Sequence, residues 1–183
     1  MMVLSQEIIY VSASVICAGI ASVYDYRYRR IPNLLTGPAI LFGLLLHLVL
    51  GGPAQLGMAA LAGLIAGGIF LVFYIAGGMG AGDVKLMTAV GCVVGMSEVK
   101  DVMVSTVLIG AAFAVVMAVR HGRLRQTLMN IVKLVRHHSS EGLTSHPELN
   151  VGNSNTLRLP YALPIAAGCL VTFYLVSIQG LSR

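Results

Sequence analysis

The apolar run 56-LGMAALAGLIAGGIFLVFYIA-76 contains no charged residue. A transmembrane helix needs ~20 predominantly apolar residues, because every backbone polar group in the bilayer must be satisfied inside the helix. Gly63 and Gly67 stand four positions apart in the run, a spacing that lets two membrane helices approach closely. The run therefore predicts a close-packed transmembrane helix, with glycines that face lipid as the alternative.

Further apolar runs lie on both sides of this one. The six runs are Ile8–Tyr24, Leu34–Leu50, Leu56–Ala76, Val84–Met96, Val102–Val119 and Leu159–Gln179. Only 10% of the residues are charged and the mean hydropathy is +0.86, whereas a soluble domain carries ~25% charged residues. Spanning β-strands alternate apolar and polar residues, and these runs do not. We expect an all-α membrane protein with six transmembrane helices, in a single domain of residues 1–183 that includes the connection 120–158.

The placement of basic residues predicts the orientation of these helices. Ten of the twelve lie in the first, third and fifth connections: Arg27, Arg29, Arg30, Lys85, Arg120, Arg123, Arg125, Lys133, Arg136 and Arg158. Only Lys100 and Arg183 lie on the other side, so the odd-numbered connections are expected to be cytoplasmic and both termini extracytoplasmic. Because basic residues follow the first run, we expect a retained span of the cytoplasmic (inner) membrane and no cleaved signal peptide.

The fifth connection predicts an additional helix. Apolar residues recur at helical spacing through Leu124, Leu128, Ile131, Val132 and Val135, with basic residues between them. This pattern is typical of an amphipathic helix on the cytoplasmic membrane surface, in contact with anionic lipids. The polar loop 139–157 follows, and its role is open.

The histidines and cysteines form no metal-binding pattern. The five histidines are scattered, apart from adjacent His137 and His138, and are interpreted as solvated or interfacial. The cysteines stand one each in three apolar runs without a CxxC pair, as small buried residues would. We expect no metal, no cofactor and no nucleic-acid partner.

Two acids stand out among the seven in the chain. Asp83 lies in 77-GGMGAGDVKLM-87, and Asp25 follows the first run; both abut apolar residues at the cytoplasmic ends of expected helices. Ionisable residues in such places are costly to keep and indicate function. Two adjacent carboxyl groups can share one proton, so that one acts as general base and the other as general acid in hydrolysis by water. Alternatively, Asp25 is solvated beside its arginines and Asp83 caps a helix.

The surrounding glycines permit close approach of a substrate backbone, or they form a flexible loop. Motifs of other hydrolases, such as GxSxG and HExxH, are absent.

Three short motifs resemble the prepilin peptidases, which are intramembrane aspartic peptidases with a GxGD signature. They are GAGDVKLM at 80–87, DYRYRRIPN at 25–33 and LPYALPIAAG at 159–168, the last similar to the small Tad/Cpa-type enzymes. The resemblance implies that Asp25 and Asp83 are catalytic, that Gly80 and Gly82 are the motif glycines and that Lys85 supports the site.

The same resemblance implies an enzyme that cleaves the basic leader of type IV pilin-like precursors at the cytoplasmic membrane face. Ala162 stands where the family often has glycine, and the missing CxxC pairs imply a peptidase without methyltransferase activity. Two alternatives stay open: a proton- or cation-coupled transporter that uses the two aspartates as an ion site, and a non-catalytic assembly factor. Neither the particular precursor nor the oligomeric state follows from the sequence.

Overall fold

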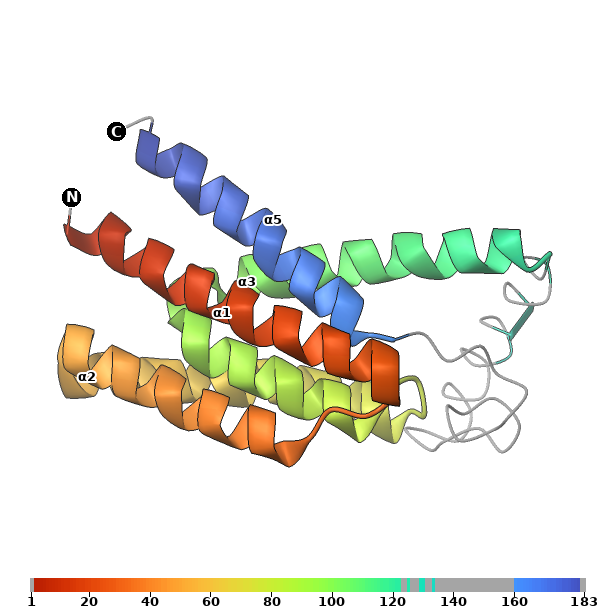
Figure 1. The fold of residues 1–183 in the computed structure, drawn as a ribbon, viewed down its shortest axis with the longest axis horizontal. Helices are drawn as coiled ribbons and strands as arrows, with labels where there is room; N and C mark the ends of the chain where they lie inside the picture. Colours follow the sequence, from red (N-terminus) through yellow and green to blue (C-terminus); the bar gives the residue numbers. More distant parts are fainter. Residues whose placement is uncertain (1, 123–124, 126–128, 131–132, 134–159, 182–183) are drawn as a thin grey trace.

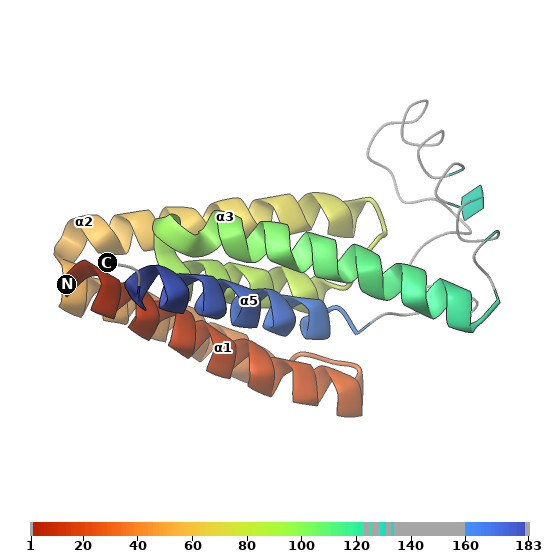
Figure 2. The same cartoon turned by 90° about the horizontal axis from the view of Figure 1, so that it is seen from above.

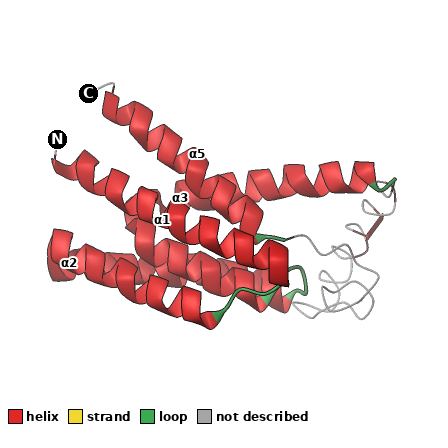
Figure 3. Cartoon of the chain, in the orientation of Figure 1, coloured by secondary structure: helices red, strands yellow, loops and turns green. Residues whose placement is uncertain are grey.

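The computed structural model describes residues 2–122, 125, 129–130, 133 and 160–181, and for residues 2–5 and 181 it describes the backbone alone. The four long helices are α1 (Met2–Tyr28), α2 (Asn33–Ile75), α3 (Ala81–Arg120) and α5 (Ala162–Leu181). Figure 3 shows helices and loops but no strand in this part of the chain. All four are long and apolar enough to cross a membrane. The prediction of an all-α, multi-pass membrane protein is therefore confirmed.

Helix α2 reverses its direction at Gly52. The backbone there has φ 79° and ψ −175°, a conformation that is essentially restricted to glycine, and Pro53 follows it. His47 before the break bonds to Val93, and Gly63 after the break packs on the neighbouring Cys92. In one straight helix, residues 47 and 63 would be ~24 Å apart, so both can reach the same point only if α2 doubles back. Figure 1 shows this reversal as the ribbon passes from orange to yellow.

Helix α3 reverses in the same way at Gly95, where φ is 73° and ψ is −175°. The electrostatic effect of Asp83 reaches Tyr161, and the Tyr161 hydroxyl lies against Gly110 in the second half. A straight helix would separate residues 83 and 110 by ~40 Å. Figure 2 shows the two halves of α3 running alongside each other. Each half of α2 and each half of α3 then forms a separate segment, and these segments together with α1 and α5 are what six spans require. The number of spans itself stays a prediction.

The predicted close-packing face is observed. A Cβ atom at Gly63 would overlap the Sγ of Cys92, and one at Gly67 would overlap the Oγ1 of Thr88. The two glycines therefore let α2 lie directly against α3, and the alternative that they face lipid is wrong. Cys92 and Cys169 are buried free thiols, as expected, whereas Cys17 is only half-buried.

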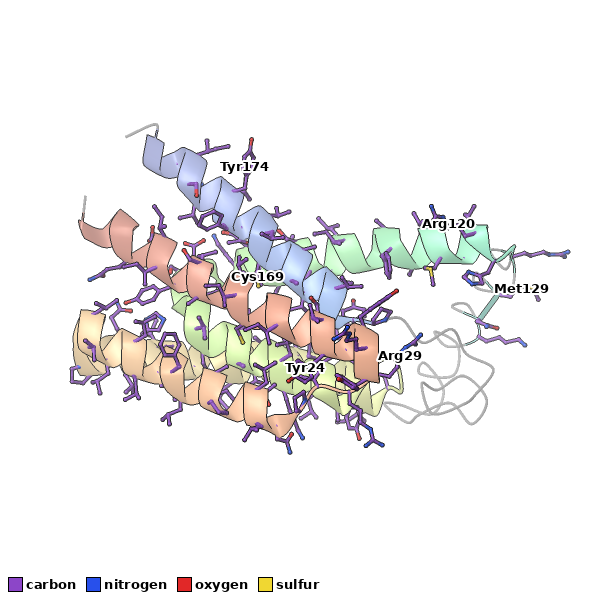
Figure 4. The ribbon with its side chains drawn as sticks, viewed as in Figure 1. Tyr24, Arg29, Arg120, Met129, Cys169 and Tyr174 are labelled. Atoms are coloured by element: carbon purple, nitrogen blue, oxygen red, sulfur yellow. The ribbon has the colours of Figure 1, made fainter. Side chains whose placement is uncertain are left out.

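The two ends of the bundle differ in the charged residues and chain termini that lie there. Both chain termini lie at the same end (Figures 1 and 2). The charges of Glu7 and Lys100 both act on Glu98, which places residues near the N-terminus close to the turn after Gly95. Figure 4 shows Arg29 at the end of α1 and Arg120 at the end of α3, both away from the termini. Which side of the membrane each end faces stays a prediction.

His47 lies in a different environment from the one that the sequence predicts. His47 is 2% exposed, and its ring stacks on Tyr10 with the centroids 3.9 Å apart. Its Nε2 lies 3.1 Å from the carbonyl oxygen of Val93. The interpretation of the scattered histidines as solvated or interfacial is wrong for His47, because the reversals at Gly52 and Gly95 enclose it.

The predicted amphipathic helix lies mostly outside the described residues. Of it, the structure describes Arg125, Met129, Asn130 and Lys133, all helical. The loop 139–157 is outside the described part altogether.

Candidate active site

The last turns of α1 place Asp25 at the edge of the bundle. Its neighbours Tyr24 and Tyr26 are 43% and 73% exposed, whereas Asp25 itself is half-buried, so the helix turns this acid inward. The helix ends at Tyr28, and Arg29 adopts a φ of 53° while its N–H donates to the Asp25 carbonyl over 2.8 Å. This sharp end directs the chain back to α2, which begins at Asn33.

Asp83 lies in the first turn of α3 and is 8% exposed. Its Oδ2 accepts a hydrogen bond of 3.1 Å from the backbone N–H of Gly80, the residue that precedes the helix. This contact is the helix cap that the sequence analysis considered as an alternative. A Cβ at Gly80 would lie 3.2 Å from the same Oδ2, so glycine leaves room for the carboxyl group.

The stretches around the two acids pack against each other. A Cβ at Gly82 would lie 3.3 Å from the Cβ of Ile31, so a larger residue would press on the loop before α2. The Nζ of Lys85 donates a hydrogen bond of 2.8 Å to Oδ1 of Asn33. The motif at 80–87 and the motif at 25–33 therefore meet through both an apolar and a polar contact. Asn33 is a site residue to which the sequence analysis assigned no role.

The two acids lie at one end of the bundle, beside the start of α5. Their charges act on each other, although they belong to different helices. The backbone N–H of Ala162 is hydrogen-bonded to the Asp25 carboxylate, and the charge of Asp83 acts on the adjacent Tyr161. Residues from α1, α3 and the start of α5 thus surround one small region.

Tyr161 is a second residue that the sequence analysis left without a role. Its ring packs edge-on against Phe70, with the centroids 6.2 Å apart. A Cβ at Gly110 would lie 2.8 Å from its hydroxyl oxygen. Burial and, to a smaller extent, the charge of Asp83 raise the pKa of Tyr161, so the phenol is neutral at physiological pH. Its position depends on the second half of α3, which nothing in the 159–168 motif indicates.

No group of three or more potential metal-binding side chains gathers within the described residues. The chemistry that this end of the bundle offers is that of two carboxyl groups, a phenol and backbone N–H donors.

The arrangement defines a class: a multi-pass helical membrane protein with two carboxyl groups at one end of its bundle. Residues 12–119 match the type IV leader peptidase family, and this range includes both acids. Because the match covers more than half of the chain, the protein belongs to this family of peptidases, as the resemblance indicated; the motifs at 25–33 and 80–87 both lie within the matched range. Comparison with the curated proteins and with the solved structures gives no match. The family favours a peptidase with a protein substrate over the transporter and assembly-factor alternatives.

Proposed function

We propose that the protein is an aspartic endopeptidase that removes the short basic leader from type IV pilin-like precursors. The observation that supports this most directly is the meeting of the stretches 25–33 and 80–87, which brings the charges of Asp25 and Asp83 within reach of each other. The family match supports leader cleavage as the reaction.

In the proposed mechanism, the two carboxyl groups share one proton because their negative charges repel. The charged carboxylate takes a proton from a water molecule, whose oxygen attacks the carbonyl carbon of the peptide bond. The protonated carboxyl group stabilises the oxygen of the resulting tetrahedral intermediate. The carbon–nitrogen bond then breaks as the leaving amine takes up a proton, and no covalent enzyme intermediate forms.

Backbone groups hold the two acids in place for this reaction. The N–H of Gly80 fixes one oxygen of Asp83, and the N–H of Ala162 engages Asp25. The bond between Lys85 and Asn33 holds the two motifs together from outside. Such donors orient the carboxyl groups before the substrate binds, which lowers the cost of reaching the reactive geometry.

We also propose that six segments cross the cytoplasmic membrane, with both termini outside and the dyad at the cytoplasmic end. The position of Arg29 and Arg120 away from the termini supports this orientation (Figure 4). The hydrophobic helix of the precursor then lies in the bilayer, with its leader at the cytoplasmic face. We assign the whole of residues 1–183 to one peptidase domain.

The proposal is tested by measuring leader removal from a type IV prepilin in membranes. We expect Asp25→Asn and Asp83→Asn each to lower the cleavage rate by at least ~10²- to 10⁴-fold, because each removes one proton-transfer group. Glu98→Gln is the matched control, since Glu98 lies at the opposite end of the bundle, and it should cleave at the wild-type rate. Normal cleavage by either aspartate variant would overturn the proposal.

A further inference from the structure

The Tyr161 hydroxyl is a donor without a partner in the described part of the chain. No hydrogen bond joins it to a described residue, and the hydroxyl is not among the buried atoms that lack a partner. Tyr161 as a whole is only half-buried. A phenol in this position is available to a molecule that binds from outside.

The ring that carries this hydroxyl is held on two sides. Phe70 of α2 packs edge-on against it at 6.2 Å, and Gly110 of α3 leaves the space that the hydroxyl end occupies. The following residue, Ala162, is the one whose N–H engages Asp25. The ring is thus fixed near Asp83, whose charge acts on it, by contacts that involve neither acid. Burial and the charge of Asp83 raise its pKa, which keeps the proton on the phenol.

We propose that Tyr161 is a third catalytic residue, whose hydroxyl donates a hydrogen bond to the carbonyl oxygen of the peptide bond that is cleaved. This inference rests on the proposed peptidase function. Negative charge develops on that oxygen when water attacks, so a fixed donor stabilises the transition state more than the bound substrate. The proton stays on Tyr161 throughout, and the dyad carries out all proton transfers.

Replacement of Tyr161 by Phe tests the inference, since the ring and its packing on Phe70 stay while the donor is lost. With a type IV prepilin as substrate, we expect kcat to fall about a hundredfold and KM to change little. A fall in kcat of less than tenfold, or a loss confined to KM, would overturn the inference. Thermal unfolding in detergent should be the same for the variant and the wild type.

Gly110→Ala provides a second test that removes no functional group. The added methyl group meets the Tyr161 hydroxyl oxygen at 2.8 Å and should displace it, whereas nothing lies within 4 Å of a Cβ at Gly68. We expect Gly110→Ala to lower kcat and the matched control Gly68→Ala to leave it unchanged. In the Tyr161→Phe background, Gly110→Ala should lower kcat little further, because the hydroxyl that it would displace is already absent. An equal loss in both backgrounds would contradict the inference.

The aspartate variants separate this inference from the function on which it rests. If Asp25→Asn and Asp83→Asn abolish cleavage while Tyr161→Phe retains it, the role of Tyr161 is refuted and the dyad stands. If the aspartate variants cleave normally, the proposed function itself fails, whatever Tyr161→Phe does.

Discussion

A hydrogen bond between side chains joins the two motifs around the acids. Lys85 on α3 reaches across to Asn33 at the start of α2, and the Nζ–Oδ1 distance is 2.8 Å. Both residues are exposed, so the bond contributes little to global stability. Its consequence is local, since it fixes the loop that follows Asp25 relative to the helix that begins near Asp83.

We predict that Lys85→Met and Asn33→Ala lower the rate of leader cleavage by similar factors. The double variant should be no slower than either single one, because each change removes the same bond. Steady-state kinetics of the three variants in membranes would show this. Losses that multiply in the double variant would mean that the two side chains act separately.

The sequence indicates the acids but not their partners. Asp25 and Asp83 are recognisable because a charge at the end of an apolar run is costly to keep. Asn33 and Tyr161 become functional only through residues far away in the chain, Lys85 and Gly110. The burial of His47 is not predicted for the same reason, because it depends on residues that are far away in the chain.

At the level of the helix, glycines determine where α2 and α3 reverse. Gly95 combines φ 73° and ψ −175° with close contact to the His47 ring, whose Cε1 would lie 2.6 Å from an added Cβ. Backbone conformation and packing therefore both require glycine at this position.

We predict that Gly95→Ala lowers the free energy of unfolding by ~1–3 kcal/mol or more, because alanine is strained in this conformation and would also press on His47. Gly57→Ala is the matched control, as nothing lies within 4 Å of a Cβ there. Thermal unfolding in mild detergent would compare the two variants with the wild type. Equal stability of all three proteins would refute the packing described at Gly95.

Hydropathy locates helices better than it locates their ends. The sequence predicts the first helix over Ile8–Tyr24, but α1 extends over Met2–Tyr28. A helix continues past its apolar residues as long as its backbone N–H and C=O groups find hydrogen-bond partners. The fourth run, Val84–Met96, is close to the first half of α3, which begins at Ala81 and breaks at Gly95. Asp83 is thus inside the helix rather than before it, which apolar spacing alone does not indicate.

Across the whole molecule, function is expected at one end and the termini at the other. The chain termini lie together (Figures 1 and 2), and the two acids, whose charges act on each other, lie near Tyr161 and Ala162. Composition and basic-residue bias predict this polarity. They do not predict that Ala162, at the start of α5, bonds to Asp25, because that contact depends on how α5 packs against α1 and α3.

We predict that the two ends are exposed on opposite sides of the membrane. Ser97→Cys, in the turn after Gly95, should react with a membrane-impermeant maleimide in intact cells, whereas Tyr28→Cys should react only after permeabilisation. Both positions are exposed in the bundle. Cys92 and Cys169 are buried but Cys17 is only half-buried, so the labelling of the wild type is measured as the background. Labelling of both variants in intact cells would refute the orientation.

The central claim is that Asp25 and Asp83 act as one catalytic unit. The most direct measurement is the rate of leader removal by Asp25→Asn, Asp83→Asn and the double variant, each inserted in membranes to the same level. If the two acids act together in the same proton transfers, either change alone abolishes their joint action. The double variant should then be no slower than the single variants. Single losses that multiply in the double variant, or a single variant that cleaves at the wild-type rate, would contradict the claim.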